Sequence, residues 1–219
     1  MEILGQLIVE AYRIRLLRGL DDLLLSTGLT HVAGVDEAGR GSLAGPVVAA
    51  AVIVDSDHAL PGIDDSKQLS PIERQRLARS IKATALAWHV AAVPPAEIDR
   101  VNILEATRLA MIQALDGLSP QPDCAVVDAV QLPPRSHPCL PLVRGDVVSY
   151  SVACASILAK TERDRLMIEL DKFYPHYGFA RHKGYAAAEH RHALAEFGPS
   201  PEHRLTFRSV LPRTTEAVH

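Results

Sequence analysis

Residues 31–54 have the sequence HVAGVDEAGRGSLAGPVVAAAVIV. Both ends of this stretch are rich in apolar and β-branched residues, which predicts two strands, 31–36 and 46–54. Glycines at positions 39, 41 and 45 predict a tight turn between them, so the two strands should form a hairpin-like pair. Asp36 and Glu37 stand directly at the end of the first strand, where the glycine-rich turn begins.

The segments around this hairpin predict one α/β domain. Residues 3–25 carry apolar residues at near-helical spacing, which predicts a single leader helix that packs on the body and ends at Gly28. Further strands are expected at 84–93, 125–128 and 140–143, and further helices from Ser70 onward and at 98–118, 149–173 and 186–197. We therefore expect a mixed sheet flanked by helices with a helical C-terminal part, organised as a leader (1–28), a domain (29–210) and a flexible tail (211–219).

Composition and charge narrow the class of protein. The chain has 219 residues, 47% hydrophobic and 22% charged, which argues against disordered, collagen-like and coiled-coil proteins. The net charge of −3 excludes a uniformly basic nucleic-acid-binding surface, but residues 172–191 contain four basic residues and one acidic residue, which predicts a local basic face.

The same sequence predicts a cytoplasmic protein. Its three cysteines form no CxxC pair, so neither a disulfide framework nor a zinc knuckle is expected. Charged residues interrupt the N-terminal apolar positions, which argues against a signal peptide. The longest weakly polar run, 43–54, is too short to span a bilayer.

Four carboxylates stand at or just after the ends of predicted strands. They are Asp36, Glu37, Asp128 and Asp146. Such groups are often solvated turn residues, but carboxylates at neighbouring strand ends can also converge and then require divalent cations to offset their repulsion. Asp64 and Asp65 form another acidic pair, for which the polar loop around them favours a role in a turn or helix entry.

Longer motifs make one family resemblance specific. Residues 35–49 resemble the signature of the type 2 ribonucleases H, in particular ribonuclease HII, and residues 65–70 resemble that family's second motif. Residues 145–165 and 174–204 are similar to its third motif and its C-terminal part, so the resemblance runs from about residue 31 to 210. We expect Ser42, which stands where proline is usual, to loosen its loop slightly. The other departures from the pattern are Gln68 for lysine, Ala129 for glycine and Thr161-Glu162 after Lys160.

The resemblance implies an RNase H-like fold with a mixed five-stranded sheet. It also implies that Asp36, Glu37, Asp128 and Asp146 hold two divalent ions, Mg²⁺ or Mn²⁺, with Asp36 as the bridging ligand. The implied reaction hydrolyses the RNA strand of RNA–DNA hybrids, including single ribonucleotides embedded in DNA, and leaves 5′-phosphate and 3′-hydroxyl ends.

Substrate contacts also follow from the resemblance. Gly39, Arg40 and Gly41 are expected to contact the 2′-hydroxyl group, and Tyr185 to pack against the next deoxyribose. Lys67 and Lys183 are candidate phosphate contacts, although a lone lysine is often only a solvated charge. The histidines at 176, 182, 190 and 192 are too loosely spaced for a metal site, so we expect most of them on the surface or beside phosphates.

Two other functions remain as alternatives to catalysis on hybrids. The first is a non-catalytic hybrid-binding module, which a missing carboxylate would indicate, and the second is a general metal-dependent DNA nuclease. The expected partners are RNA–DNA hybrids and ribonucleotide-containing DNA, with no membrane, no obligate protein partner and a monomeric state. The related ribonuclease HIII is disfavoured because it carries an extra N-terminal domain.

Overall fold

A five-stranded mixed sheet forms the centre of the molecule, as expected. The computed structural model describes residues 2–211. Its strands lie in the order β3 (Ala87–Val93), β2 (Val47–Ile53), β1 (Val32–Ala38), β4 (Cys124–Asp128) and β5 (Cys139–Leu142). β2 runs antiparallel to both β3 and β1, whereas β4 and β5 run parallel to β1. The predicted hairpin-like pair is confirmed, because β1 and β2 pair with Val35 opposite Ala51.

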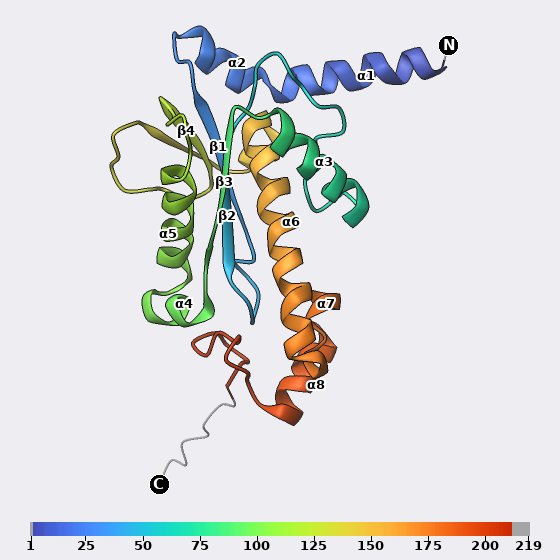
Figure 1. The fold of residues 1–219 in the computed structure, drawn as a ribbon, viewed down its shortest axis with the longest axis vertical. Helices are drawn as coiled ribbons and strands as arrows, with labels where there is room; N and C mark the ends of the chain where they lie inside the picture. The colour runs from blue at the N-terminus through green and yellow to red at the C-terminus, as the bar shows by residue number, and fades with distance from the viewer. Residues whose placement is uncertain (1, 212–219) are drawn as a thin grey trace.

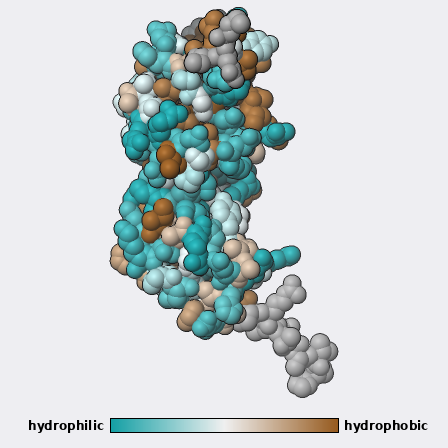
Figure 2. All heavy atoms as spheres, turned by 90° about the vertical axis from the view of Figure 1, so that its right-hand side faces the viewer, coloured by the Kyte–Doolittle hydropathy of each residue, from teal (hydrophilic) through white to brown (hydrophobic). Residues whose placement is uncertain are grey.

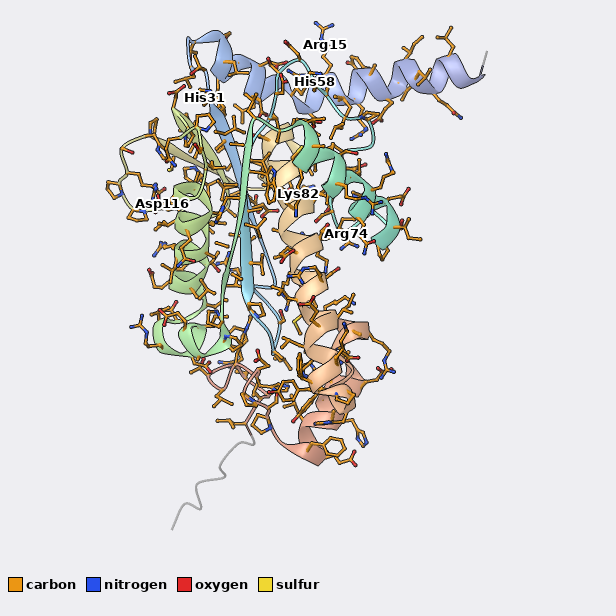
Figure 3. All side chains as sticks on the ribbon, viewed as in Figure 1. Arg15, His31, His58, Arg74, Lys82 and Asp116 are labelled. Atoms are coloured by element: carbon orange, nitrogen blue, oxygen red, sulfur yellow. The ribbon has the colours of Figure 1, made fainter. Side chains whose placement is uncertain are left out.

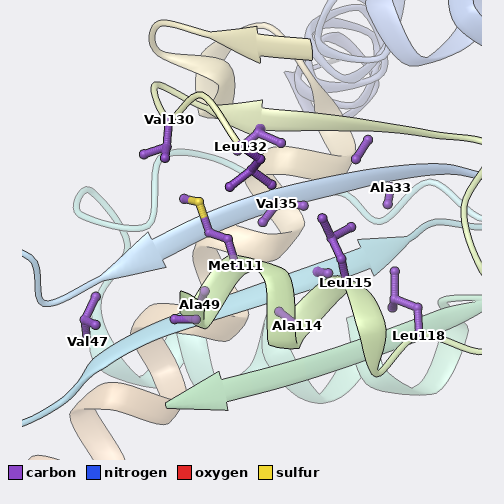
Figure 4. Packing of buried hydrophobic residues seen from close by; sticks show 14 of the residues in the cluster. Ala33, Val35, Val47, Ala49, Met111, Ala114, Leu115, Leu118, Val130 and Leu132 are labelled. Atoms are coloured by element: carbon purple, nitrogen blue, oxygen red, sulfur yellow. The ribbon is translucent and has the colours of Figure 1, made fainter. Parts of the chain in front are cut away.

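Helices cover both faces of this sheet (Figure 1). On one face lie α4 (Pro95–Val101) and α5 (Ile103–Asp116), and on the other lie α3 (Pro71–Thr84) and α6 (Tyr150–Phe173). Successive residues of β2 alternate between the two layers: Ala49 packs with α5 (Figure 4), whereas Ala50 packs with α6. Beyond α6, the chain continues as the predicted helical C-terminal part through η2 (Pro175–Tyr177), α7 (Phe179–His182) and α8 (Ala188–Phe197).

Two helix starts follow the capping signals in the sequence. The Ser70 hydroxyl group accepts a hydrogen bond from the Glu73 N–H at 3.3 Å, and the Ser70 N–H donates to the Glu73 carboxylate at 3.1 Å, which is a complete capping box. At the start of α6, Ser149 Oγ accepts from the Val152 N–H at 3.3 Å. These caps fix the first residues of α3 and α6, the two helices on one face of the sheet.

The expected single leader helix is instead two helices, α1 (Glu2–Leu17) and α2 (Gly19–Ser26). In α2, the buried Asp21 accepts hydrogen bonds from the backbone N–H groups of Tyr150 and Ser151, which docks α2 on the start of α6. In α1, Ile14 and Leu17 pack on the body, and Glu10 accepts the Gly62 N–H at 2.7 Å. The side chains of Leu4, Leu7, Ile8 and Val9 are exposed, and hydrophobic residues accordingly appear at the top of Figure 2, where α1 points toward the viewer.

Two further boundaries differ from expectation. The predicted helix at 98–118 is divided at Asn102, whose backbone has a φ of 73° and whose side chain caps α5 by accepting from the N–H groups of Leu104 and Glu105. The strand expected from residue 84 begins at Ala87, because α3 continues through Thr84. The tail predicted for 211–219 lies, from residue 212 on, outside the described residues. Within residues 2–211, no helix is long and apolar enough to cross a bilayer.

Candidate active site

Three of the four predicted carboxylates converge at the ends of two parallel strands. Val35 of β1 lies opposite Val127 of β4, so the next residues along the two strands, Asp36 and Asp128, are neighbours. Oxygen atoms of Asp36, Glu37 and Asp128 lie within 4.8 Å of one another. We call these three residues the carboxylate cluster.

Asp36 is the buried member of the cluster, with 6% of its surface exposed. Burial raises the pKa of Asp36 well above its ordinary value, the neighbouring charges of Glu37 and Asp128 raise it further, and a hydrogen bond from Ser156 opposes them. Ser156 reaches Asp36 from α6 because Gly34 of β1 has no side chain: a Cβ atom there would overlap the α6 backbone at Ser151. The result is a carboxylate whose charge is costly unless a cation shares it.

Glu37 has a free oxygen in the same place. Its Oε2 atom is buried and has no hydrogen-bond partner among the described residues, while Oε1 lies 3.6 Å from Nη1 of Arg40. Burial raises the pKa of Glu37, and the charge of Arg40 only partly offsets this effect. A buried, unpaired oxygen beside two further carboxylates fits a hard divalent cation such as Mg²⁺ or Mn²⁺, since every donor in the cluster is oxygen.

The fourth predicted carboxylate, Asp146, lies beside the cluster without joining the group of three. It belongs to the short helix η1 (Gly145–Val147), which is tied to β4 because the Gly145 N–H donates to Asp128 Oδ1 at 2.7 Å. The pKa of Asp146 is raised by burial, then by the charges of Asp128 and Asp65, and is lowered by Lys67. The charge of Asp65 thus acts on Asp146, and Asp65 also has the turn role predicted for it, in which it accepts the Lys67 N–H at 2.9 Å.

Next to Glu37, residues 39–46 form what we call the glycine loop. Gly39 has a φ of 92°, and a Cβ atom on it would overlap the Arg163 side chain. Arg163 is fully buried and hydrogen-bonds to three groups of this loop, the Ser42 hydroxyl group at 2.6 Å, the Ala44 carbonyl at 3.2 Å and the Pro46 carbonyl at 3.1 Å. Ser42 also donates to the Gly39 carbonyl at 2.7 Å. The expectation that Ser42 loosens the loop is therefore wrong, because its hydroxyl group bridges the loop to Arg163.

A second buried arginine, Arg204, holds the same loop from the C-terminal segment. Its guanidinium group donates to the carbonyl groups of Gly39, Arg40 and Gly45 at 2.8–3.0 Å. Burial and the nearby charge of Arg163 lower the pKa of Arg204 to about 9. Within the described chain the amide N–H groups of Arg40 and Gly41 donate to no protein acceptor, so they remain available as hydrogen-bond donors.

Residues 183–185, which we call the tyrosine turn, lie against the glycine loop. The Leu43 N–H donates to the Gly184 carbonyl at 2.8 Å, and Arg163 donates to the Lys183 carbonyl at 3.0 Å. The Tyr185 ring is 40% exposed, and the Arg163 guanidinium carbon lies 5.4 Å from its centre. Two segments more than 130 residues apart therefore form one surface, built around Arg163.

The two lysines predicted to contact phosphates differ in their exposure. Lys67 is exposed beside Asp146, whereas Lys183 is half-buried and its ammonium group donates to the Ala180 carbonyl. Near Lys183, Arg74 projects from α3 toward α6 (Figure 3), where it pairs with Asp164 at 2.9 Å. Lys160 pairs with the same carboxylate at 2.7 Å and lies 5.8 Å from the centre of the Tyr185 ring.

The sequence interpretation assigned no role to Arg163, Arg204 or Ser156. All three are polar residues that are buried, and their burial can be recognised only once the packing is known. The histidine expectation is wrong for His190, which is fully buried together with His203.

Comparisons with known proteins agree with this geometry. A family model described as Ribonuclease HII matches residues 33–210. The chain is 50% identical to a ribonuclease HII of Syntrophomonas wolfei over 204 residues, covering 93% of this chain and 80% of that one. It is 54% identical to a ribonuclease HII of Chloroflexus aurantiacus over 189 residues, covering 84% of this chain and 89% of that one. The crystal structure of the ribonuclease H2 from Pyrococcus horikoshii OT3 superposes with a TM-score of 0.72 at 27% identity, covering 83% of this chain and 95% of that one. The chain therefore belongs to the ribonuclease HII family and is a metal-dependent endoribonuclease that acts on RNA–DNA hybrids.

Proposed function

We propose that this endonuclease also cleaves at single ribonucleotides embedded in duplex DNA, and that it does so with two divalent cations, Mg²⁺ or Mn²⁺. The carboxylate cluster and Asp146 would hold them. The observation that carries the cation assignment is the buried, unpaired Oε2 atom of Glu37 beside Asp36 and Asp128. When bound, a pair of such cations supplies an activated water and stabilises the leaving 3′-oxygen, which leaves 5′-phosphate and 3′-hydroxyl ends.

In this proposal the chain's own residues supply selectivity. The free amide N–H groups of Arg40 and Gly41 are donors for a ribose 2′-hydroxyl group, which is the group that distinguishes RNA from DNA. They lie next to Glu37 in sequence, so a ribose bound there is adjacent to the carboxylate cluster. Because Arg163 and Arg204 hold the carbonyl groups of the loop, its amides are fixed before substrate arrives.

Tyr185 is proposed to test the sugar that follows the ribonucleotide. Its partly exposed ring presents an apolar face beside the glycine loop. A deoxyribose gains contact with that face, whereas a ribose would have its 2′-hydroxyl group buried without a partner, at a cost of about 1–3 kcal/mol. Lys67 and Lys183 are proposed to contact phosphates of the duplex, Lys67 with the more freely exposed ammonium group.

The test compares three duplexes that differ only in sugar: one embedded ribonucleotide, a long RNA–DNA hybrid and all DNA. The wild-type protein should cleave the first two and leave the third intact. Tyr185→Ala should lower the ratio of kcat/KM on the embedded ribonucleotide to kcat/KM on the hybrid by about tenfold, the equivalent of 1.4 kcal/mol. Tyr185→Phe should lower it less, since the ring face remains.

Each outcome is decisive for one part of the proposal. No cleavage at the embedded ribonucleotide by the wild-type protein would overturn that activity. An unchanged ratio in Tyr185→Ala would show that the ring is only a packing residue and that the junction is recognised elsewhere.

A further inference from the structure

Two buried histidines connect the C-terminal segment to the main chain of Tyr185. His190 of α8 and His203 are 0% and 1% exposed, and their Nε2 atoms lie 2.9 Å apart. The other ring nitrogen of His190, Nδ1, lies 2.9 Å from the Tyr185 carbonyl oxygen. The Nδ1 atom of His203 lies 2.9 Å from the backbone nitrogen of Ser200.

The direction of every hydrogen bond in this chain follows from one fixed donor. The Ser200 backbone N–H can only donate, so His203 Nδ1 is an acceptor and the proton of the neutral His203 ring is on Nε2. His203 Nε2–H then donates to His190 Nε2, which places the His190 proton on Nδ1. His190 Nδ1–H therefore donates to the Tyr185 carbonyl group. Burial lowers the pKa of His190, and lowers that of His203 to about 4, so both rings are neutral near pH 7 as the chain requires.

The tyrosine turn needs such a support. Lys183 and Gly184 both have left-handed backbones, with φ values of 52° and 76°, and this conformation costs free energy at the non-glycine residue. His182 stacks on His190 with ring centres 4.5 Å apart and accepts the Gly184 N–H at 3.2 Å. The carbonyl group of Tyr185 therefore receives a side-chain hydrogen bond where the strained part of the turn ends.

We propose that His190 and His203 are positioning residues for junction recognition: their relay, from the Ser200 N–H to the Tyr185 carbonyl, holds the Tyr185 ring at the edge of the glycine loop. This inference rests on the proposed role of Tyr185 and adds to it the residues that set the position of the ring. Neither histidine touches the substrate. Their loss should therefore affect cleavage at an embedded ribonucleotide, which depends on Tyr185, more than cleavage of a long hybrid.

The experiment measures the same ratio of kcat/KM values on the embedded ribonucleotide and on the hybrid, in four variants. His190→Leu removes the side-chain donor to the Tyr185 carbonyl, which keeps only the Ala187 N–H at 2.8 Å, and should lower the ratio by about 3- to 10-fold, since small displacements of a positioned group have effects of this size or larger. His190→Asn places an amide N–H near the former Nδ1 position and should keep the ratio within about twofold of wild type. The matched control is His192→Leu, two residues along the same helix, whose exposed side chain faces away from the relay and should change nothing.

The fourth variant combines His190→Leu with Tyr185→Ala. Because the histidine acts through the tyrosine, the double variant should show the same ratio as Tyr185→Ala alone. A full additional decrease in the double variant would overturn the proposal, as would an unchanged ratio in His190→Leu or a failure of His190→Asn to retain it. If Tyr185→Ala itself leaves the ratio unchanged, the role of Tyr185 in the proposed function fails, which is a separate result.

A measurement on the wild-type protein covers the case in which His190→Leu does not fold. Imidazole ¹⁵N chemical shifts report which ring nitrogen carries the proton. The relay requires a proton on Nδ1 of His190 and on Nε2 of His203. Finding the His190 proton on Nε2 would mean that His190 does not donate to the Tyr185 carbonyl, and would overturn the proposal.

Discussion

The carboxylate cluster and the glycine loop are adjacent in sequence but are built in opposite ways. In the cluster, Asp36 and Glu37 are acids of one charge, buried together with too few donors, and their pKa values are raised. In the loop, the carbonyl groups are held by the buried guanidinium groups of Arg163 and Arg204. One region keeps unsatisfied charge for a ligand, and the other is satisfied in advance. The difference shows that one short segment contains a region whose buried charges destabilise the fold and a region whose hydrogen bonds stabilise it.

Neutralising Asp36 should have the largest effect, because it should lower activity and raise the stability of the metal-free protein. Asp36→Asn should reduce kcat/KM on a hybrid by about 10³-fold or more, because a carboxylate of the cluster is lost. In metal-free buffer the same change should raise Tm by about 2–4 °C, since it removes repulsion and the burial of a charge. Hydrolysis assays and thermal unfolding in a chelator test both parts, with Asp57→Asn in an exposed loop as the control. Near-wild-type turnover would refute the assignment of the cluster.

Removing Arg163, the α6 arginine that holds the glycine loop, should lower stability, whereas Asp36→Asn should raise it. Arg163→Leu leaves several buried carbonyl groups without donors and should lower the free energy of unfolding by about 3 kcal/mol or more, together with activity. Arg165→Leu, two residues along α6, breaks only exposed ion pairs and should cost less than about 1 kcal/mol. Urea unfolding compares the two variants. Equal losses would mean that the loop does not depend on Arg163.

The stabilities contributed by the histidine relay and by the carboxylate cluster should respond to pH with opposite signs. His203 has a folded pKa of about 4 against an ordinary value of 6.5, with His190, His182 and Tyr177 as the titratable groups around it. The unfolded chain therefore binds a proton that the folded ring does not, and this contribution to stability is lost as pH falls from about 6.5 toward 4, by up to about 1.4 kcal/mol per pH unit. The raised pKa values in the carboxylate cluster act the other way, because protonation at low pH relieves the buried charges.

The difference in unfolding free energy between the wild type and His203→Gln isolates the histidine contribution. That difference should shrink as pH decreases through this window. A difference independent of pH would show that His203 does not stay neutral in the folded protein.

The smallest effect is expected at the other strand of the cluster. Ala129, which follows Asp128 where the family frequently has glycine, is exposed and has a φ of 48°. Ala129→Gly should raise the free energy of unfolding by about 0.5–1 kcal/mol, because glycine adopts this backbone without strain. Ala125→Gly, in the regular part of β4, should instead be destabilising. Thermal unfolding of both variants provides the comparison.

Local sequence patterns were sufficient for most of the fold. The β-branched and apolar residues at 46–54 and the capping box at Ser70 predicted β2 and α3, and family motifs pointed to Asp36 and Glu37. The break between α1 and α2 was missed, because apolar spacing alone does not show that Asp21 docks on the start of α6. The division at Asn102 depends on a side-chain cap that a continuous apolar stripe conceals.

Other residues of the site could not be predicted from the sequence, for a different reason. The roles of Arg163, Arg204 and His190 are defined by hydrogen bonds to backbone groups that are distant in sequence, for Arg204 as much as 165 residues away. An arginine or histidine in a helix looks the same in sequence whether it is solvated or buried. Sequence could therefore predict carboxylates that converge in the structure, and the structure was needed to show what holds the glycine loop and the tyrosine turn in place.

Arg204 is translated 159 residues after Gly45, whose carbonyl oxygen it binds. On a growing chain, both strands that carry the carboxylates leave the ribosome long before this arginine does. Until then the carbonyl groups of residues 39, 40 and 45 lack the donor that holds them in the finished protein. The carboxylates of the cluster are thus all synthesised before the arginine that holds the carbonyl groups of the glycine loop, so this loop is the part of the site whose hydrogen bonds are completed last.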